Sequence, residues 1–183
     1  KIYRIPPPDS ITSPVVTGSI IRYTYEDQKE FPPPAAARNF DADALVAIND
    51  DLFIFTKNRT FPFTGYSKVY RLSQEAGDQI ATPVDSIFLG NDSMLDHWVT
   101  SADISPDGKT LALLSLRRLW LITDFPAGKF SSGKITRVDL EHFSHKAGLA
   151  FATNTKIFIV DELEFGIGGK LYTLDLREVY DRP

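Results

Sequence analysis

The sequence predicts an all-β fold built from repeated four-stranded antiparallel sheets, and three observations support this prediction. Short apolar runs recur along the 183 residues, each bounded by turn-forming residues, which is typical of β-strands. Long amphipathic helix patterns are missing from the chain. An internal repeat relates three segments that begin near residues 43, 102 and 147.

The apolar runs predict about thirteen strands, rich in the aliphatic and aromatic residues that suit a pleated, packed surface. In chain order they cover 2–5, 20–25, 44–48, 52–56, 68–72, 84–89, 99–104, 110–115, 119–123, 135–140, 149–152, 156–160 and 171–176. The clearest turn lies between two of them, where Pro106 presets φ and Asp107-Gly108 supplies the polar and left-handed positions of a tight hairpin. The triple-proline runs 6–8 and 32–34 are predicted to be stiff connectors, because proline cannot pair in a central strand.

The repeat sets the size of the structural unit. Its three copies start at Asp43, Ala102 and Ala147, so the spacings are 59 and 45 residues. Each copy contains three strands, and a fourth strand closes the first two copies at 84–89 and 135–140. Four strands in about 45 residues is the blade period of a β-propeller. The sequence therefore predicts a β-propeller with four-stranded antiparallel blades.

The chain contains too few strands for a complete ring. Residues 1–40 are expected to end a preceding blade and to connect it to a blade at 41–90, a blade at 91–140 and an incomplete blade at 141–183. This makes about three blades, whereas closed propellers typically have about four to eight. An open stack exposes unpaired strand edges and apolar faces. We therefore expect a partial propeller, the C-terminal part of a longer chain, with the missing blades supplied by that chain or by a second one.

Composition excludes several classes of protein. The chain has no cysteine, which excludes a disulfide framework and a cysteine-based zinc site. Its net charge of −4 argues against a general nucleic-acid binder. No apolar run approaches the ~18 residues of a membrane-spanning helix, so no transmembrane segment is predicted.

Two segments carry a resemblance to known families. The segment 99–109, VTSADISPDGK, resembles the blade signature of many bacterial propellers. The segments 146–151 and 159–162 look like the innermost hairpin of phytase-like and gluconolactonase-like propellers, and the likeness of pattern covers residues 1–176. The resemblance implies an uncharacterised bacterial propeller protein that is secreted or periplasmic. Those families commonly place an acid before the glycine of this hairpin, where this chain has Ala102 and Ala147 and keeps only Asp43.

One face of the predicted propeller carries the candidate binding site. The loops between the second and third strands of each blade and the loops that join blades fall on the same face, where propellers usually bind ligands. These loops cover 57–66, 116–118, 162–169, 90–98 and 141–145. The residues predicted to form the ligand-binding face are Lys57, Arg59, His97, Trp98, His142, His145 and Lys146. They combine groups that titrate near neutral pH with cations and an aromatic ring, which binding surfaces use. The alternatives are solvated or strand-capping histidines and a Trp98 that fills the space between blades.

Three functions remain open at this point, because propellers host many unrelated activities. The first is a rigid binding scaffold outside the cytoplasm, with an unknown ligand. The second is a calcium-assisted hydrolase of the phytase, esterase or lactonase type, in which Asp43, Asp161 and Glu162 would be the metal ligands, since carboxylate oxygens suit calcium. The third is a module of a larger assembly that uses the unpaired blade edges as its interface. Whether the chain is an enzyme stays open.

Overall fold

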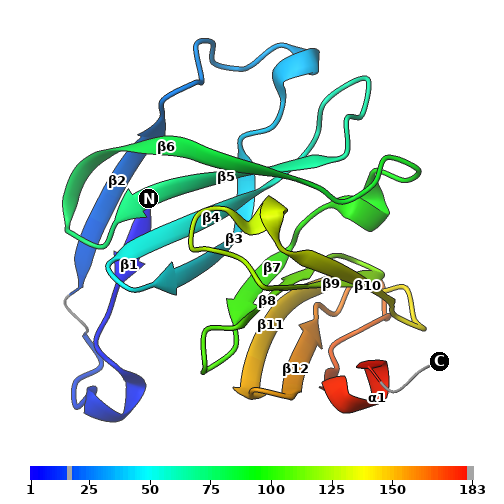
Figure 1. The fold of residues 1–183 in the computed structure, drawn as a ribbon. Helices are drawn as coiled ribbons and strands as arrows, with labels where there is room; N and C mark the ends of the chain where they lie inside the picture. Colours follow the sequence, from blue (N-terminus) through cyan, green and yellow to red (C-terminus); the bar gives the residue numbers. More distant parts are fainter. Residues whose placement is uncertain (16–17, 181–183) are drawn as a thin grey trace.

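The computed structural model describes residues 1–15 and 18–180, which contain thirteen strands and only short helices (Figure 1). The strands are β1 (Ile2–Arg4), β2 (Ser19–Tyr25), β3 (Asp41–Ile48), β4 (Asp51–Lys57), β5 (Tyr66–Ser73), β6 (Gly77–Phe88), β7 (Ser101–Ile104), β8 (Thr110–Leu114), β9 (Arg118–Thr123), β10 (Lys134–Asp139), β11 (Lys146–Thr153), β12 (Lys156–Asp161) and β13 (Leu171–Asp175). The short helices are η1 (Pro8–Ser10), η2 (Ala35–Ala37), η3 (Leu95–His97), η4 (Phe130–Ser132) and α1 (Leu176–Tyr180). Each predicted apolar run overlaps one strand, which confirms the predicted all-β class.

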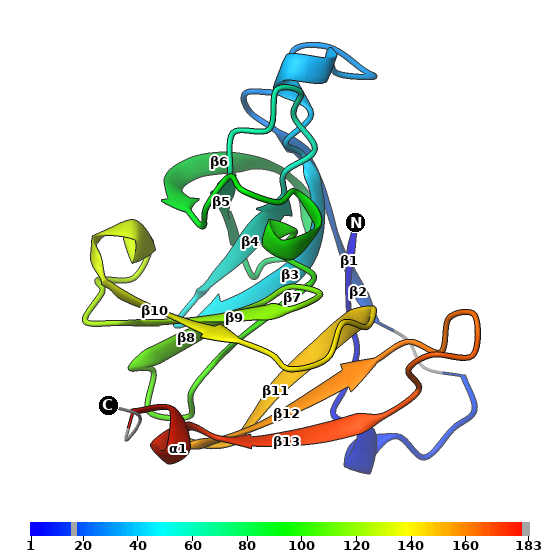
Figure 2. The same ribbon diagram turned by 90° about the vertical axis from the view of Figure 1, so that its right-hand side faces the viewer.

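The strands form three antiparallel meanders of the kind found in propeller blades. Blade 1 contains β3 to β6, blade 2 contains β7 to β10 and blade 3 contains β11 to β13, each in sequence order across its sheet. Short turns connect several of the neighbouring strands, as at Gly108, whose φ of 71° supplies the left-handed position between β7 and β8. The first strands β3, β7 and β11 lie side by side, and Figure 2 shows the three sheets stacked one above another along this line. The fold is that of a β-propeller segment.

The first 40 residues contribute two strands, which are joined to blade 1 through the long strand β6. β1 pairs with β2, and β2 pairs in parallel with the first half of β6, from Gly77 to Ala81. The second half of β6 pairs with β5, so the long strand joins both partners in one six-stranded sheet. Ile21 of β2 is buried against Ile54 and Leu72, on the side of blade 1 where a preceding blade was expected.

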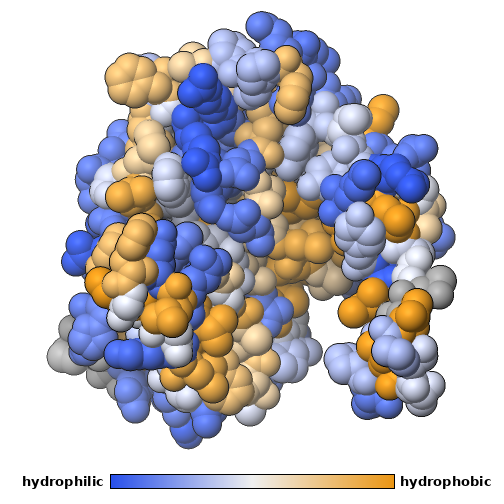
Figure 3. Space-filling view, turned by 180° about the vertical axis from the view of Figure 1, so that it is seen from behind, coloured by the Kyte–Doolittle hydropathy of each residue, from blue (hydrophilic) through white to orange (hydrophobic). Residues whose placement is uncertain are grey.

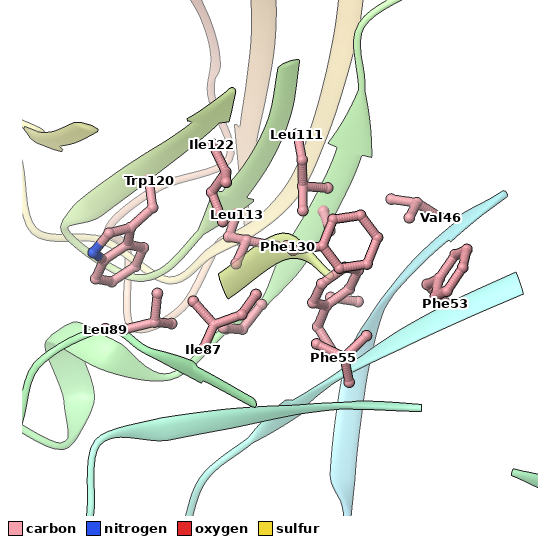
Figure 4. Close-up of a cluster of buried hydrophobic side chains, with 14 residues drawn as sticks. Val46, Phe53, Phe55, Ile87, Leu89, Leu111, Leu113, Trp120, Ile122 and Phe130 are labelled. Atoms are coloured by element: carbon pink, nitrogen blue, oxygen red, sulfur yellow. The ribbon is translucent and has the colours of Figure 1, made fainter. Parts of the chain in front are cut away.

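The central strands of the blades are apolar on both sides because both sides are covered. In β4, Phe53 and Phe55 face blade 2, while Leu52 and Ile54 face β2. The same alternation places Leu111 and Leu113 of β8 toward blade 1 and the next residues toward blade 3. Figure 4 shows the cluster between blades 1 and 2, in which Phe130 from η4 lies against Phe53 and Phe55 with ring centroids 5.2 and 5.4 Å apart.

Blade 3 is covered on one side only. Ile157 and Ile159 of β12 pack against Leu114 and its neighbours in blade 2. On the opposite face, Val160 is 44% exposed and its cross-strand partner Leu171 is 66% exposed. Among the described residues, no helix is long and apolar enough to cross a membrane.

The packing of the cluster between blades 1 and 2 predicts that truncating one of its side chains lowers the stability of the fold. Replacing the fully buried Phe130 by alanine is expected to lower the free energy of unfolding by about 3–5 kcal/mol, because it empties space that three neighbouring rings cannot refill. Equilibrium urea unfolding measures the change. Phe165→Ala is the control, since Phe165 is 97% exposed and its loss should change stability by less than about 0.5 kcal/mol. Equal unfolding midpoints for the two variants would contradict this description of the core.

Candidate ligand-binding face

The loops predicted to share one face of the propeller contact one another. Trp98, in the loop between blades 1 and 2, donates its indole N–H to the Asn58 carbonyl in the β4–β5 loop at 2.6 Å. The Ser115 hydroxyl, in the β8–β9 loop, donates to the Asp96 carbonyl at 2.7 Å. On blade 3, the backbone N–H that follows β12 donates to the His145 carbonyl at 2.9 Å. The first two hydrogen bonds fix loops of blades 1 and 2 relative to one another, and the third joins two loops of blade 3.

A cavity of about 330 Å³ opens where these loops meet, and we call it the three-blade cavity. Its lining residues are Lys57, Arg59, Leu95, Trp98, Thr100, Leu116, Phe143, His145 and Glu164. Four of the seven residues predicted for the ligand-binding face are among them. The apolar part of the lining comes from Leu95, Leu116 and Phe143, which sequence reasoning missed. Leu95 and Phe143 are exposed apolar residues in loops between blades, and the position of Phe143 among the polar residues of 141–145 was a signal available in the sequence.

Trp98 and Arg59 form the centre of the cavity wall. The Arg59 guanidinium lies over the indole ring, 4.6 Å from its centroid, and its Nε donates to Asp41 at 2.7 Å. The indole N–H is already bound to the Asn58 carbonyl, so the ring is fixed by this hydrogen bond at its edge and by Arg59 at its face. Trp98 thus bridges blades 1 and 2 and also presents part of its surface to the cavity. A fixed aromatic–cation pair of this kind is a common anchor of binding surfaces.

His97 lies beneath this face and not on it. Its ring is buried, 5.7 Å from the ring of Trp120, and Nδ1 donates to the Ser93 carbonyl. That tautomer leaves Nε2 as the acceptor for a guanidinium N–H of Arg118. Gly90 passes so close that a side chain there would collide with the imidazole. The structure therefore gives His97 a packing role.

Lys146 and His142 also lie outside the three-blade cavity. The Lys146 ammonium is buried and donates to the Leu116 carbonyl at 3.2 Å, to the Ser144 hydroxyl at 3.0 Å and to the His142 carbonyl. Burial lowers the pKa of Lys146, although Asp161 opposes the shift. Lys146 thus ties the β8–β9 loop of blade 2 to blade 3. The His142 side chain is exposed and lines a smaller cavity of about 190 Å³ beside β13.

The three acids expected to bind calcium do not form a metal site. Asp43 pairs with Lys57. Asp161 accepts hydrogen bonds from the Lys170 amide at 2.7 Å and the Tyr172 hydroxyl at 2.9 Å. Burial alone would raise the pKa of Asp161, but these hydrogen bonds lower it below its usual value. Glu162 lies 3.5 Å from the His145 imidazole. Across the described residues, no group of three or more His, Asp or Glu side chains is arranged to hold a metal ion, so this donor set does not fit calcium.

Comparison with known proteins found similar chains among solved structures. No family model and no curated protein matches the sequence. Among solved structures, Sqt1 of Saccharomyces cerevisiae is similar, with a TM-score of 0.42 and 10% identity over 74% of this chain. Hsv2 of Kluyvelomyces marxianus has a TM-score of 0.37 and 18% identity over 61% of this chain. Both are β-propellers of the WD40 type, and the matches cover 36% and 33% of their own lengths, so this chain spans about a third of either. The resemblance to bacterial extracytoplasmic propellers stays a prediction.

Arg118 connects the loop between blades 1 and 2 to the strands of blade 2 through ion pairs. Its guanidinium donates to both carboxylate oxygens of Asp92, at 3.0 and 3.4 Å, and lies 3.3 Å from Asp139 and 3.9 Å from Asp96. Hydrogen bonds to Asp92 and the nearby charges of the three carboxylates raise the pKa of Arg118. Hydrogen bonds from Arg118 lower the pKa of Asp92 to about 2.

This network predicts an acid-dependent loss of stability. The ordinary pKa of an aspartate is 3.8, and the folded state lowers that of Asp92, so the stabilisation is present above pH 4 and is lost as the pH falls toward about 2. Urea unfolding midpoints measured between pH 5 and pH 2 should fall more steeply for the wild type than for Asp92→Asn. Asp9→Asn, in the short helix η1, is the control and should follow the wild type. Parallel profiles for the wild type and Asp92→Asn would refute the assignment.

Proposed function

We propose that the chain is a binding scaffold whose three-blade cavity takes an apolar side chain from a short peptide segment of a partner protein. The observation that carries the proposal is the pair of exposed apolar residues, Leu95 and Phe143, beside the Trp98–Arg59 pair. Exposed apolar side chains next to a fixed aromatic ring and a guanidinium are the residue types that dominate the energy of protein interfaces.

The charges around the cavity support an apolar occupant. Lys57 pairs with Asp43, Arg59 pairs with Asp41, and the His145 imidazole lies 3.2 Å from Glu164. Because each charged group on the rim already has a partner within the chain, the rim offers no strong net charge to a ligand. An apolar centre with a polar, internally paired rim is the usual anatomy of a protein interface.

Binding is better supported than hydrolysis. The acids that a calcium-assisted hydrolase would need, Asp43, Asp161 and Glu162, are engaged separately and do not converge. A location outside the cytoplasm stays a prediction of the family resemblance.

The proposal is tested with a displayed library of random short peptides selected on the whole chain. Enriched peptides should share an apolar anchor residue. Their affinity for Phe143→Asp should be lower by a factor of at least about ten, because burying a carboxylate beneath the bound peptide costs free energy. Binding should also shift the emission of the half-buried Trp98, while the other tryptophan, Trp120, lies in the core.

Phe165→Asp is the matched control, since Phe165 is an exposed aromatic residue outside the three-blade cavity. It should bind the selected peptides as the wild type does. The proposal fails if no peptide is enriched, or if the enriched peptides bind Phe143→Asp and Phe165→Asp equally well.

We also propose that a further propeller blade, from the same longer chain or from a second chain, covers the open face of blade 3. That face presents Val160 and Leu171 to solvent, with Phe158 beside them and the small residues Gly148 and Ala150 on the neighbouring strand. On blades 1 and 2 the equivalent apolar faces are covered by a neighbouring sheet. Figure 3 shows the back of the molecule, where a gap separates a projecting segment from the main body.

The uncovered face predicts self-association of this chain. Sedimentation velocity should give an average mass that rises with concentration for the wild type, because apolar faces of this kind pair when nothing else covers them. The double variant Val160→Glu, Leu171→Glu should remain monomeric. Ile80→Glu, at an exposed position of β6, should associate like the wild type. A wild-type chain that stays monomeric over the whole concentration range would contradict the proposal.

A further inference from the structure

A second cavity, of about 400 Å³, lies on the other side of blade 1, between the β2–β3 connector and the β4–β5 loop. We call it the connector cavity. The two segments rise side by side in Figures 1 and 2, and backbone hydrogen bonds join them, from the Arg59 N–H to the Arg38 carbonyl at 2.8 Å and from the Phe61 N–H to the Ala35 carbonyl at 2.9 Å. The volume falls within the range of small-molecule sites, about 300–1,000 Å³.

The aromatic side chains that line the connector cavity are fixed by contacts with residues outside it. Tyr25 and Phe40 lie with ring centroids 5.5 Å apart, and Tyr25 packs on Tyr70 at 4.5 Å. The Lys68 ammonium lies 4.6 Å from the centroid of the Phe40 ring and is itself fixed by Asp27 at 2.6 Å. Since these rings are already packed and paired, a ligand does not have to order them, which favours binding.

Phe31 forms the open side of the cavity. Its ring is 92% exposed, although it belongs to the lining. A large aromatic side chain left in water on the wall of a cavity lined by two packed rings gains contacts when a further flat group enters that cavity. Aromatic rings pair favourably in stacked or edge-to-face arrangements, so a planar aromatic ligand fits this space.

The connector cavity also carries one uncompensated positive charge. Of its two guanidinium groups, Arg59 is neutralised by Asp41 at 2.7 Å. Arg38 donates from Nε to the Pro33 carbonyl at 3.5 Å, and within the described part of the chain no carboxylate lies at ion-pair distance from it. A guanidinium in this position is suited to a planar anionic group, which it can bind through two hydrogen bonds.

We propose that the connector cavity is a binding site for a small planar aromatic molecule that carries one anionic group, with the ring between Phe31 and the Tyr25–Phe40 pair and the anion on Arg38. This site is separate from the three-blade cavity and does not depend on the function proposed for it. Arg59 lines both cavities, so it is not used to test either.

The probe is 2-naphthoate, titrated into the whole chain by calorimetry and followed by NMR. The affinity of the neutral isostere 2-naphthamide should be lower than that of naphthoate by a factor of at least about ten, because the amide cannot form the charged pair with Arg38. Arg38→Gln should lower naphthoate affinity to the level of the amide, and Phe31→Ser should weaken both ligands. Both side chains are exposed, so these variants should keep the fold.

Matched control variants distinguish binding at this site from nonspecific binding to exposed arginine or aromatic side chains. Arg4→Gln removes one exposed arginine from β1, and Phe165→Ser removes one exposed aromatic ring from blade 3; neither should change naphthoate binding. Phe143→Asp, which disables the three-blade cavity, should leave it unchanged as well. The inference is overturned if naphthoate does not bind, if naphthoate and naphthamide bind equally, or if Arg38→Gln binds naphthoate as well as Arg4→Gln does.

Discussion

The structure depends on the need to cover both faces of each apolar sheet. Phe53 and Phe55 of β4 point to one side and Ile54 to the other, and all three are buried, so a single sheet in water could not be stable. Stacking the sheets meets this need: blade 2 lies between blades 1 and 3, and β2 covers the outer side of blade 1. Blade 3 does not meet this need, because its outer face, with Val160 and Leu171, is exposed.

The same stacking builds the candidate binding face. Because the sheets are stacked with their first strands adjacent, the loops at one end of each blade meet, and polar side chains fix them there. Trp98 binds the Asn58 carbonyl between blades 1 and 2, and the buried Lys146 binds the Leu116 carbonyl between blades 2 and 3. Residues at these junctions therefore position the cavity even where they do not line it. Function and stability share the same interfaces between blades.

Much of the fold could be predicted from the sequence because its signals are local. Short apolar runs and turns such as Asp107-Gly108 mark the strands and hairpins. The parallel pairing of β2 with β6 has no local signal, since its partners lie far apart in the chain. Of the candidate site, four residues line the three-blade cavity, but the burial of His97 and Lys146 could not be foreseen. Polar residues in short loop helices and at strand ends are normally exposed. Here Arg118 compensates the burial of His97, and backbone carbonyls that only the folded chain brings near compensate that of Lys146.

The central claim is that three blades form one rigid unit that carries the binding face. The chain has no cysteine, so spin labels can be placed at Ser86→Cys on β6 and Thr173→Cys on β13, two exposed strand positions in blades 1 and 3. Pulsed electron paramagnetic resonance then measures the distance between the blades. A single narrow distance distribution is the result that this account predicts. A broad distribution, or several distances, would show that the blades move independently and would contradict it.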